Sequence, residues 1–228
     1  MERFFAIIGR ISSVLTLLFV LGLGSVITWV YWSNSQWQRR GAIEIPAEKS
    51  TSNHSVLLRF EPIENINGTN TQIIRLSAQE KSGKFYSGGY GRETRNILFL
   101  TGDEKKARWL FPKQTNLIIV TAQLREKSED RKDSPVKAFY FEYVSEDSND
   151  DGKLNAEDQS SVALSKPDGS GVIEILHSVN RVLSYGMLGS QQLSVVYQKD
   201  KSVRHAKIAI PAFTVETNQE ITSIPDEL

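Results

Sequence analysis

Residues Val136 to Val144 read VKAFYFEYV, and this stretch decides the fold class. Successive side chains of a strand point to opposite faces, so Phe139, Phe141 and Tyr143 share one face. Alternation with a period of two is typical of a β-strand rather than of an amphipathic helix. The stretch therefore predicts a strand whose aromatic face belongs to the core.

Short apolar runs with the same period recur on both sides of this strand, and turn residues separate them. We expect further strands at Val56–Phe60, Gln72–Ser77, Asn96–Thr101, Ala107–Phe111, Leu117–Ala122, Ser161–Ser165, Val172–Leu176, Arg181–Met187, Gln192–Tyr197 and Val203–Ile210. None of these segments has the apolar stripe of an amphipathic helix. The predicted fold is mainly β, an antiparallel domain arranged as a sandwich, a barrel or an incomplete propeller-like stack.

The chain begins with a segment of a different kind. Ile11 to Trp32 reads ISSVLTLLFVLGLGSVITWVYW and contains no charged residue. As a helix it would span about 33 Å, enough to cross a hydrocarbon core of about 30 Å. Aromatic side chains gather at its C-terminal end, where they favour the membrane interface, and no A-x-A-like cleavage site follows. We therefore expect a transmembrane helix rather than a cleaved signal peptide.

These observations divide the chain into five predicted segments. They are a cytoplasmic N-terminal flank at 1–10, a transmembrane helix at 11–32, a linker at 33–54, a β-rich domain at 55–213 and a flexible tail at 214–228. Basic residues nearly balance on the two sides of the helix, and the short N-terminal side is easily kept in the cytoplasm. We expect a single-pass protein of the inner, cytoplasmic membrane with its C-terminal domain in the periplasm.

Composition excludes several classes of function. The 228 residues include 27 Lys and Arg, 27 Asp and Glu, and no cysteine. A net charge of zero lacks the basic footprint of a nucleic-acid binder, so no nucleic-acid partner is expected. Without cysteine there is no disulfide, no zinc–thiolate site and no cysteine nucleophile.

Motifs for catalysis are missing as well. The three histidines show neither H-x-H nor H-E-x-x-H spacing, and the sequence contains no G-x-S-x-G and no phosphate-binding glycine loop. From this we expect no catalytic residues and no enzyme. Aromatic side chains could still form a binding surface, although most aromatic residues belong to a core. The aromatic candidates are Tyr86, Tyr90, Trp109, Phe111, Phe139, Tyr140 and Phe141.

Two stretches resemble TolB-type β-propeller repeats. Asn96–Phe111 has an apolar strand, a Thr-Gly-Asp turn and a returning strand, and Val162–Gly171 has a strand followed by Pro-Asp-Gly. The resemblance covers about a third of the chain and implies propeller-like blades in a periplasmic scaffold that binds proteins. At roughly 40 residues a blade, the domain would hold about four blades at most.

The loop from Asp147 to Asp158, DSNDDGKLNAED, fits the template of a calcium loop except at its last position. Ca²⁺ prefers six to eight oxygen ligands, and Gly152 would permit the sharp turn at position 6. The last position holds the shorter Asp in place of Glu, which predicts weaker binding. The segment before the loop reads as a strand, so the loop resembles a dockerin-like calcium loop rather than a helical EF-hand. The predicted ligands are Asp147, Asn149, Asp151, Lys153 through its carbonyl, Asn155 and Asp158.

Together these features predict a membrane-anchored envelope protein whose non-catalytic β domain binds or scaffolds other proteins and is stabilised by calcium. The alternative from the same sequence is a cell-envelope enzyme or carbohydrate-binding module that uses a cleft of carboxylates and aromatic rings.

Overall fold

The computed structural model describes residues 56–80, 93–126, 134–152 and 154–225. This part of the chain contains thirteen strands and no helix, and every strand pairing is antiparallel, which confirms the mainly β prediction. None of the described residues forms a helix that could cross a membrane. The predicted transmembrane helix, residues 11–32, and the linker, 33–54, lie outside the described residues.

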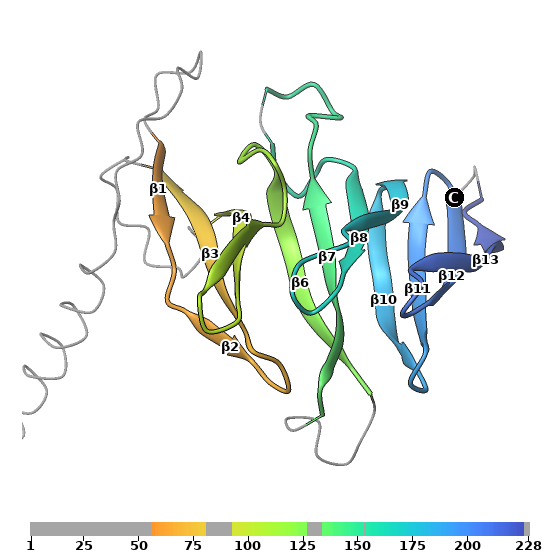
Figure 1. Cartoon of the computed structure of the whole chain (residues 1–228). Helices are drawn as coiled ribbons and strands as arrows, with labels where there is room; N and C mark the ends of the chain where they lie inside the picture. Colours follow the sequence, from red (N-terminus) through yellow and green to blue (C-terminus); the bar gives the residue numbers. More distant parts are fainter. Residues whose placement is uncertain (1–55, 81–92, 127–133, 153, 226–228) are drawn as a thin grey trace, which may run out of the picture. The chain divides into compact units, whose positions relative to one another are not determined.

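The first group of strands runs from β1 to β5. Its strands are β1 (Val56–Phe60), β2 (Glu64–Ile66), β3 (Thr71–Glu80), β4 (Glu93–Thr101) and β5 (Lys106–Trp109). The central strands β3 and β4 pair with each other. β1 and β2 follow one another along the outer edge of β3, and β5 forms the predicted hairpin with β4 (Figure 1).

The second group is a meander in which each strand pairs with the next along the chain. It contains β6 (Leu117–Arg125), β7 (Val136–Val144), β8 (Ser160–Ser165) and β9 (Ile173–Val179). One residue pair, Thr94 of β4 with Ile118 of β6, joins it to the first group. The two groups formally share one nine-stranded sheet, but the junction is a single point.

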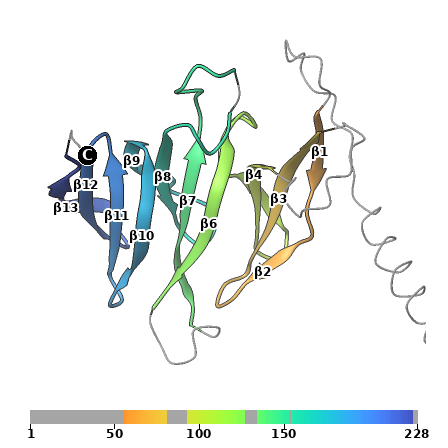
Figure 2. The ribbon, with the colours of Figure 1, turned by 180° about the vertical axis from the view of Figure 1, so that it is seen from behind.

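The third group is a separate four-stranded sheet with the same meander order. It contains β10 (Arg181–Leu188), β11 (Gln192–Lys199), β12 (Ser202–Ala209) and β13 (Thr214–Ser223) (Figures 1 and 2). The last strand differs from the flexible tail predicted from residue 214 onward. Its polar sequence lacks the usual apolar alternation because neither face is buried, but backbone hydrogen bonds to β12 still order it.

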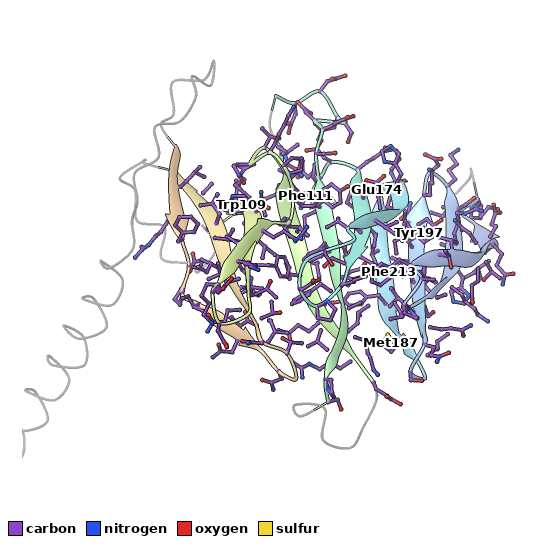
Figure 3. All side chains as sticks on the ribbon, in the orientation of Figure 1. Trp109, Phe111, Glu174, Met187, Tyr197 and Phe213 are labelled. Atoms are coloured by element: carbon purple, nitrogen blue, oxygen red, sulfur yellow. The ribbon has the colours of Figure 1, made fainter. Side chains whose placement is uncertain are left out.

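Between the first and second groups lies a core rich in aromatic rings. Phe99 of β4 meets Phe139 of β7 edge to face, with ring centroids 5.4 Å apart. The ring centroid of Phe111, which Figure 3 labels, lies 4.6 Å from that of Tyr143. The aromatic face predicted for β7 is therefore a core face. The buried members are Ile66, Ile73, Ile97, Phe99, Leu110, Phe111, Ile118, Val136, Phe139, Phe141, Tyr143 and Ala163.

The opposite face of the second group packs against the third. β7 turns Ala138 and Tyr140 to this side, and the third group contributes Met187, Tyr197 and Phe213, which Figure 3 labels. The further buried members are Leu124, Val162, Leu164, Leu176, Val179, Leu193, Val195, Ala206, Ile208 and Ile210. The second group is thus covered on both faces, which explains why β7 and β8 are buried almost throughout.

The turn between β8 and β9 lies against the first group of strands. It is the predicted Pro-Asp-Gly turn, in which Oδ1 of Asp168 accepts hydrogen bonds from the amide and hydroxyl of Ser170 at 3.0 and 2.7 Å. Gly169 has a φ of +75°, and a Cβ there would lie 2.4 Å from two ring carbons of Phe99. Glycine is therefore required at position 169 for two reasons. Other residues rarely adopt this φ, and any Cβ would clash with the ring of Phe99.

We expect Gly169→Ala to lower the free energy of unfolding by about 2–4 kcal/mol, because it adds a clash with a buried ring to the cost of a positive φ. Gly102→Ala is the matched control. Its φ is +70° but nothing lies within 4 Å of the added Cβ, so about 1 kcal/mol is expected there. Denaturant unfolding measures both, and equal losses would show that Phe99 does not restrict this position.

Candidate functional site

A groove lies between β6 and β10, the first strands of the second and third groups. Its volume is about 490 Å³. Within the described residues, β10 pairs only with β11, and Ala122 to Leu124 of β6 pair only with β7. Two strand edges with open backbone positions therefore border one groove. The lining residues are Ala122, Gln123, Leu124, Arg125, Glu126, Ser184, Tyr185, Gly186, Met187, Leu188 and Ser194.

A pair of stacked tyrosines connects this groove to a buried carboxyl group. Tyr185 of β10 lies in the groove wall, and its ring stacks on Tyr140 of β7 at a centroid distance of 4.2 Å and an interplanar angle of 14°. The hydroxyl of Tyr140 donates to Oε1 of Glu142 at 2.7 Å. Tyr140 is fully buried and Glu142 is 9% exposed, so this hydrogen bond is shielded from water.

Burial determines the electrostatics of this group. It raises the pKa of Glu142, and the hydrogen bond from Tyr140 opposes that shift only in part. Burial also raises the pKa of Tyr185, and the nearby charge of Glu142 adds to the effect. A carboxyl group with a raised pKa beside a phenol can hold or release a proton, and this one lies behind the groove wall rather than among the residues that line the groove.

The predicted calcium loop is closed by hydrogen bonds from its own backbone. The two carboxylate oxygens of Asp147 accept from the amides of Asp151 at 3.2 Å and Gly152 at 2.8 Å, and Asn149 accepts from Asp151 at 3.0 Å. Asn155 donates to Oδ2 of Asp151 at 3.3 Å. Four of the predicted ligands therefore gather on one turn, and Gly152 has the expected positive φ of 78°.

The last predicted ligand, Asp158, has a different role in this structure. It is buried, and its two oxygens accept from the backbone amides of Ser148 at 2.8 Å and Asn155 at 2.9 Å. The hydrogen bond from Asn155 is the main cause that lowers the pKa of Asp158. In the part of the chain that the structure describes, no three His, Cys, Asp or Glu side chains are placed to hold a metal. The remaining predicted ligand, Lys153, lies outside the described residues, and the calcium site stays a prediction.

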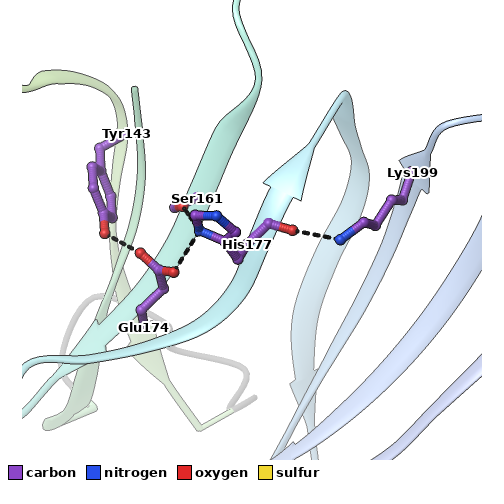
Figure 4. Close-up of polar contacts among 5 residues, drawn as sticks. All are labelled: Tyr143, Ser161, Glu174, His177 and Lys199. Carbon is purple, nitrogen blue, oxygen red and sulfur yellow. Dashed lines mark hydrogen bonds and ion pairs between the residues drawn. The ribbon is translucent and has the colours of Figure 1, made fainter. Parts of the chain in front are cut away.

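A second polar cluster lies across β7, β8 and β9. Tyr143 donates its hydroxyl hydrogen to Oε2 of Glu174, and Oε1 of Glu174 lies 2.8 Å from Nδ1 of His177 (Figure 4). The hydroxyl of Ser161 lies 3.2 Å from the same nitrogen. Nζ of Lys199 donates to the backbone carbonyl of His177 at 3.1 Å.

This cluster contains the residue types of a serine triad but not its geometry. Ser161 and Glu174 both contact Nδ1 of His177, whereas a triad needs the serine on Nε2 and the acid on Nδ1. The arrangement therefore joins three strands through hydrogen bonds and does not activate the serine. His205 on β12 is engaged separately, with Nε2 2.8 Å from the hydroxyl of Ser194.

The five described residues among the aromatic candidates from the sequence do not form a common cleft. Phe111, Phe139, Tyr140 and Phe141 are buried in the two cores. Trp109 is 36% exposed and stacks on Phe60 at a centroid distance of 6.2 Å. Tyr86 and Tyr90 lie outside the described residues.

Sequence reasoning missed Glu142 and Tyr185. Glu142 did leave a signal, because it is the one acidic residue within the otherwise apolar run from Ala138 to Val144. An acidic residue in a strand that is buried on both faces indicates a carboxyl group that is largely removed from water. Tyr185 left none, because its stacking partner comes from another sheet.

Comparison with known proteins gives little further information. No model of a known protein family matches the chain, and no curated protein matches it. Among solved structures, a luciferin-regenerating enzyme aligns with 10% identity and a TM-score of 0.36, over 72% of this chain and 60% of that one. The chain thus spans less than two thirds of the length of that protein, and a likeness at this TM-score carries no argument about function.

One expectation from the sequence is corrected. We expected that the chain is not an enzyme, whereas the solved structure that aligns with it is named as an enzyme, and we withdraw that expectation. The expectation rested on missing sequence motifs, and catalytic groups that meet only in space leave no such motif.

We expect Glu142→Gln to raise Tm by a few degrees at pH 7, because the amide keeps an acceptor for Tyr140 without burying a charge. The folded pKa of Glu142 lies above its ordinary value of 4.5, so its contribution to stability is present below pH 4.5 and is lost as the pH rises. The gain should therefore vanish near pH 4. Thermal unfolding from pH 4 to 7 measures it, with the exposed Glu157→Gln as control. A variant less stable than the parent at pH 7 would contradict the assignment.

Proposed function

We propose that this chain is a membrane-anchored protein of the bacterial cell envelope whose β domain binds another protein. Residues 11–32 would anchor it in the inner membrane, with 1–10 in the cytoplasm. The linker 33–54 would carry the domain into the periplasm. The uncharged apolar length of the first segment and the aromatic residues at its end support this part of the proposal.

The observation that carries the proposal is the exposure of β13. All ten residues from Thr214 to Ser223 are exposed, and in the described part of the chain this strand pairs with β12 alone. Two large apolar side chains, Val215 and Ile221, are 41% and 56% exposed. A long exposed edge strand is a template on which an extended segment of another chain can form further hydrogen bonds.

The arrangement of the strands supports a propeller-like scaffold as the architecture behind this function. The second and third groups are four-stranded antiparallel meanders. One core lies between the first and second groups and another between the second and third. Successive four-stranded meanders packed face to face are the building plan of propeller blades. We infer an incomplete propeller rather than a barrel, which would need one continuous closed sheet.

Calcium would stabilise the domain through the loop from Asp147 to Asp158. Asp147, Asn149, Asp151 and Asn155 gather on one turn, and a cation there would offset the repulsion between the carboxylates. Asp158 is used by backbone amides, so the site would have fewer protein ligands than a full calcium loop.

A photo-crosslinking residue at Ile221, in the full chain in its own membrane, tests the binding proposal. We expect an adduct of one defined mass, because a paired segment would lie directly along β13. Val215→Lys should reduce its yield severalfold, since a lysine on an edge strand opposes pairing with a further strand. The matched control places the crosslinker at Ile63, which is equally exposed at 56% but lies outside the strands.

The proposal fails if Ile221 gives no adduct, or if Ile63 gives the same adducts. An adduct of twice the mass of the chain would identify the partner as a second copy. A reporter fused after Leu228 tests the location, and activity in the cytoplasm alone would contradict a periplasmic domain.

Thermal unfolding of the full chain with 1 mM Ca²⁺ or with chelator tests the calcium loop. A site with a Kd near 10⁻⁵ M adds about 2.7 kcal/mol, or roughly 5–10 °C in Tm. Asp151→Ala should abolish the shift. Asp150→Asn should keep it, because position 4 supplies no ligand and asparagine tolerates the φ of 59° found there. Equal Tm values with and without calcium would reduce the loop to an acidic turn.

A further inference from the structure

We propose that Ser194 and His205 form a catalytic dyad that hydrolyses carboxylic esters in the groove between β6 and β10. This activity goes beyond the proposed function, which concerns binding along β13. Three observations carry it. They are the hydrogen bond between the serine and Nε2 of the histidine, the position of the serine in the groove wall, and the open space over Gly186 beside it.

The hydrogen bond has the geometry that a histidine needs to act as a general base. Oγ of Ser194 on β11 lies 2.8 Å from Nε2 of His205 on β12. With the ring proton on Nδ1, Nε2 accepts the hydroxyl hydrogen of the serine. The other serine–histidine pair of the domain, Ser161 and His177, makes its contact at Nδ1 instead. The domain therefore contains one pair with the catalytic arrangement and one without it.

Alternation along the strands places both members of the dyad on the face of the third group that points away from the core. Leu193 and Val195 are buried in the core, so Ser194 between them points to the other face. On β12 the same alternation buries Ala206 and turns His205 to the side of Ser194. Ser194 and His205 are only half-buried, and a substrate can therefore reach them.

The groove gives the serine room for a substrate. Ser194 lines the groove, and Gly186 lies directly opposite it in the ladder between β10 and β11. Apart from the chain neighbours of Gly186, no heavy atom lies within 4 Å of a Cβ built there. Side chains that are directly opposite lie only about 5 Å apart, so this open space is next to the Ser194 hydroxyl. Leu188, the next residue on this face of β10, is 44% exposed and offers an apolar wall for an aliphatic acyl chain.

The reaction uses the ester and water alone. Oγ of Ser194 attacks the ester carbonyl carbon while its proton passes to Nε2 of His205. The bond from this carbon to the alcohol oxygen then breaks, and Nε2 gives the proton to the leaving alkoxide. Water hydrolyses the acyl-serine in the same way, which yields the carboxylic acid and restores the serine. Lys207 lies directly opposite Ser194 on β12, within reach of the negative charge that develops on the carbonyl oxygen.

The surroundings of His205 restrict the class of substrate. The residue opposite His205 on β13 is Gln219, a neutral amide, and no carboxylate among the described residues is hydrogen-bonded to His205. In a complete triad the acid contributes about 10⁴ to the rate. We therefore expect slow hydrolysis of esters and none of amides, because an alkoxide is a better leaving group than an amine. A groove of about 490 Å³ has the size of a small-molecule site.

A fluorophosphonate probe and p-nitrophenyl butyrate test the dyad on the full chain in detergent. We expect the probe on Ser194, located by mass spectrometry of peptides, and a burst of about one p-nitrophenol per chain before slow turnover, because the acyl-serine accumulates. Ser194→Ala should remove both signals. The absence of probe from Ser194 would overturn the proposal, and so would a burst that persists in Ser194→Ala.

The second serine–histidine pair supplies a matched control for the histidine. His205→Gln keeps a hydrogen-bonding side chain beside Ser194 but cannot take its proton, and we expect the burst rate to fall about a hundredfold. His177→Gln removes the same imidazole from a pair in which the serine contacts Nδ1, and it should leave the rate unchanged. Equal rates in the two variants would overturn the role of His205.

Gly186→Val tests the site without changing the dyad. Gly186 has no positive φ and valine fits a strand, so the fold should be kept. The added side chain fills the space next to Ser194 and should slow the burst at least tenfold. Leu183→Val is the control, because Leu183 lies on the same strand but does not line the groove. An unchanged rate in Gly186→Val, or an equal loss in Leu183→Val, would overturn the assignment of the reaction to this groove.

Discussion

The burial of β7 on both faces is the constraint on which the rest of the domain depends. Neighbouring residues of a strand point in opposite directions, so Phe139 and Phe141 must be covered on one side and Tyr140 on the other. A single sheet cannot meet this requirement. The first and third groups of strands each cover one face, and the second group lies between two cores.

This arrangement also explains where the polar chemistry of the domain lies. Glu142 shares a face with Tyr140, so the same alternation that buries the ring also buries the carboxyl group. The stack of Tyr140 on Tyr185 then connects this group to β10 in the third group. The groove residue Tyr185 therefore lies one ring away from the buried pair of Tyr140 and Glu142, and the second and third groups both contribute to this arrangement.

One strand of this domain, β13, is ordered although it is not buried. β13 is exposed along its whole length and is held by the backbone ladder to β12, by a hydrogen bond from Tyr197 to Asn218 and by contacts of Glu220 with Ser202 and Arg204. Such a strand is ordered although its sequence has no apolar alternation that would predict it. The turn at Gly169 is the opposite case, because the Phe99 ring of another group of strands restricts it.

The local patterns of the sequence were sufficient to place most strands. Alternation identified β7, and the Thr-Gly-Asp hairpin between β4 and β5 and the Pro-Asp-Gly turn between β8 and β9 were expected from their turn residues. The calcium template placed Asp147, Asn149 and Asp151 on one turn, but it could not assign Asp158 to the amides of Ser148 and Asn155. That assignment depends on how the end of the loop is buried.

The sequence by itself determined the β class of this domain, because period-two alternation and turn chemistry act between residues that are close along the chain. Only the tertiary structure decided which strands stack and which edges stay open. The contact between Tyr140 and Tyr185 and the groove between β6 and β10 also depend on the tertiary structure. These features depend on the packing of whole sheets against one another, and contacts between residues so distant in sequence leave no local pattern.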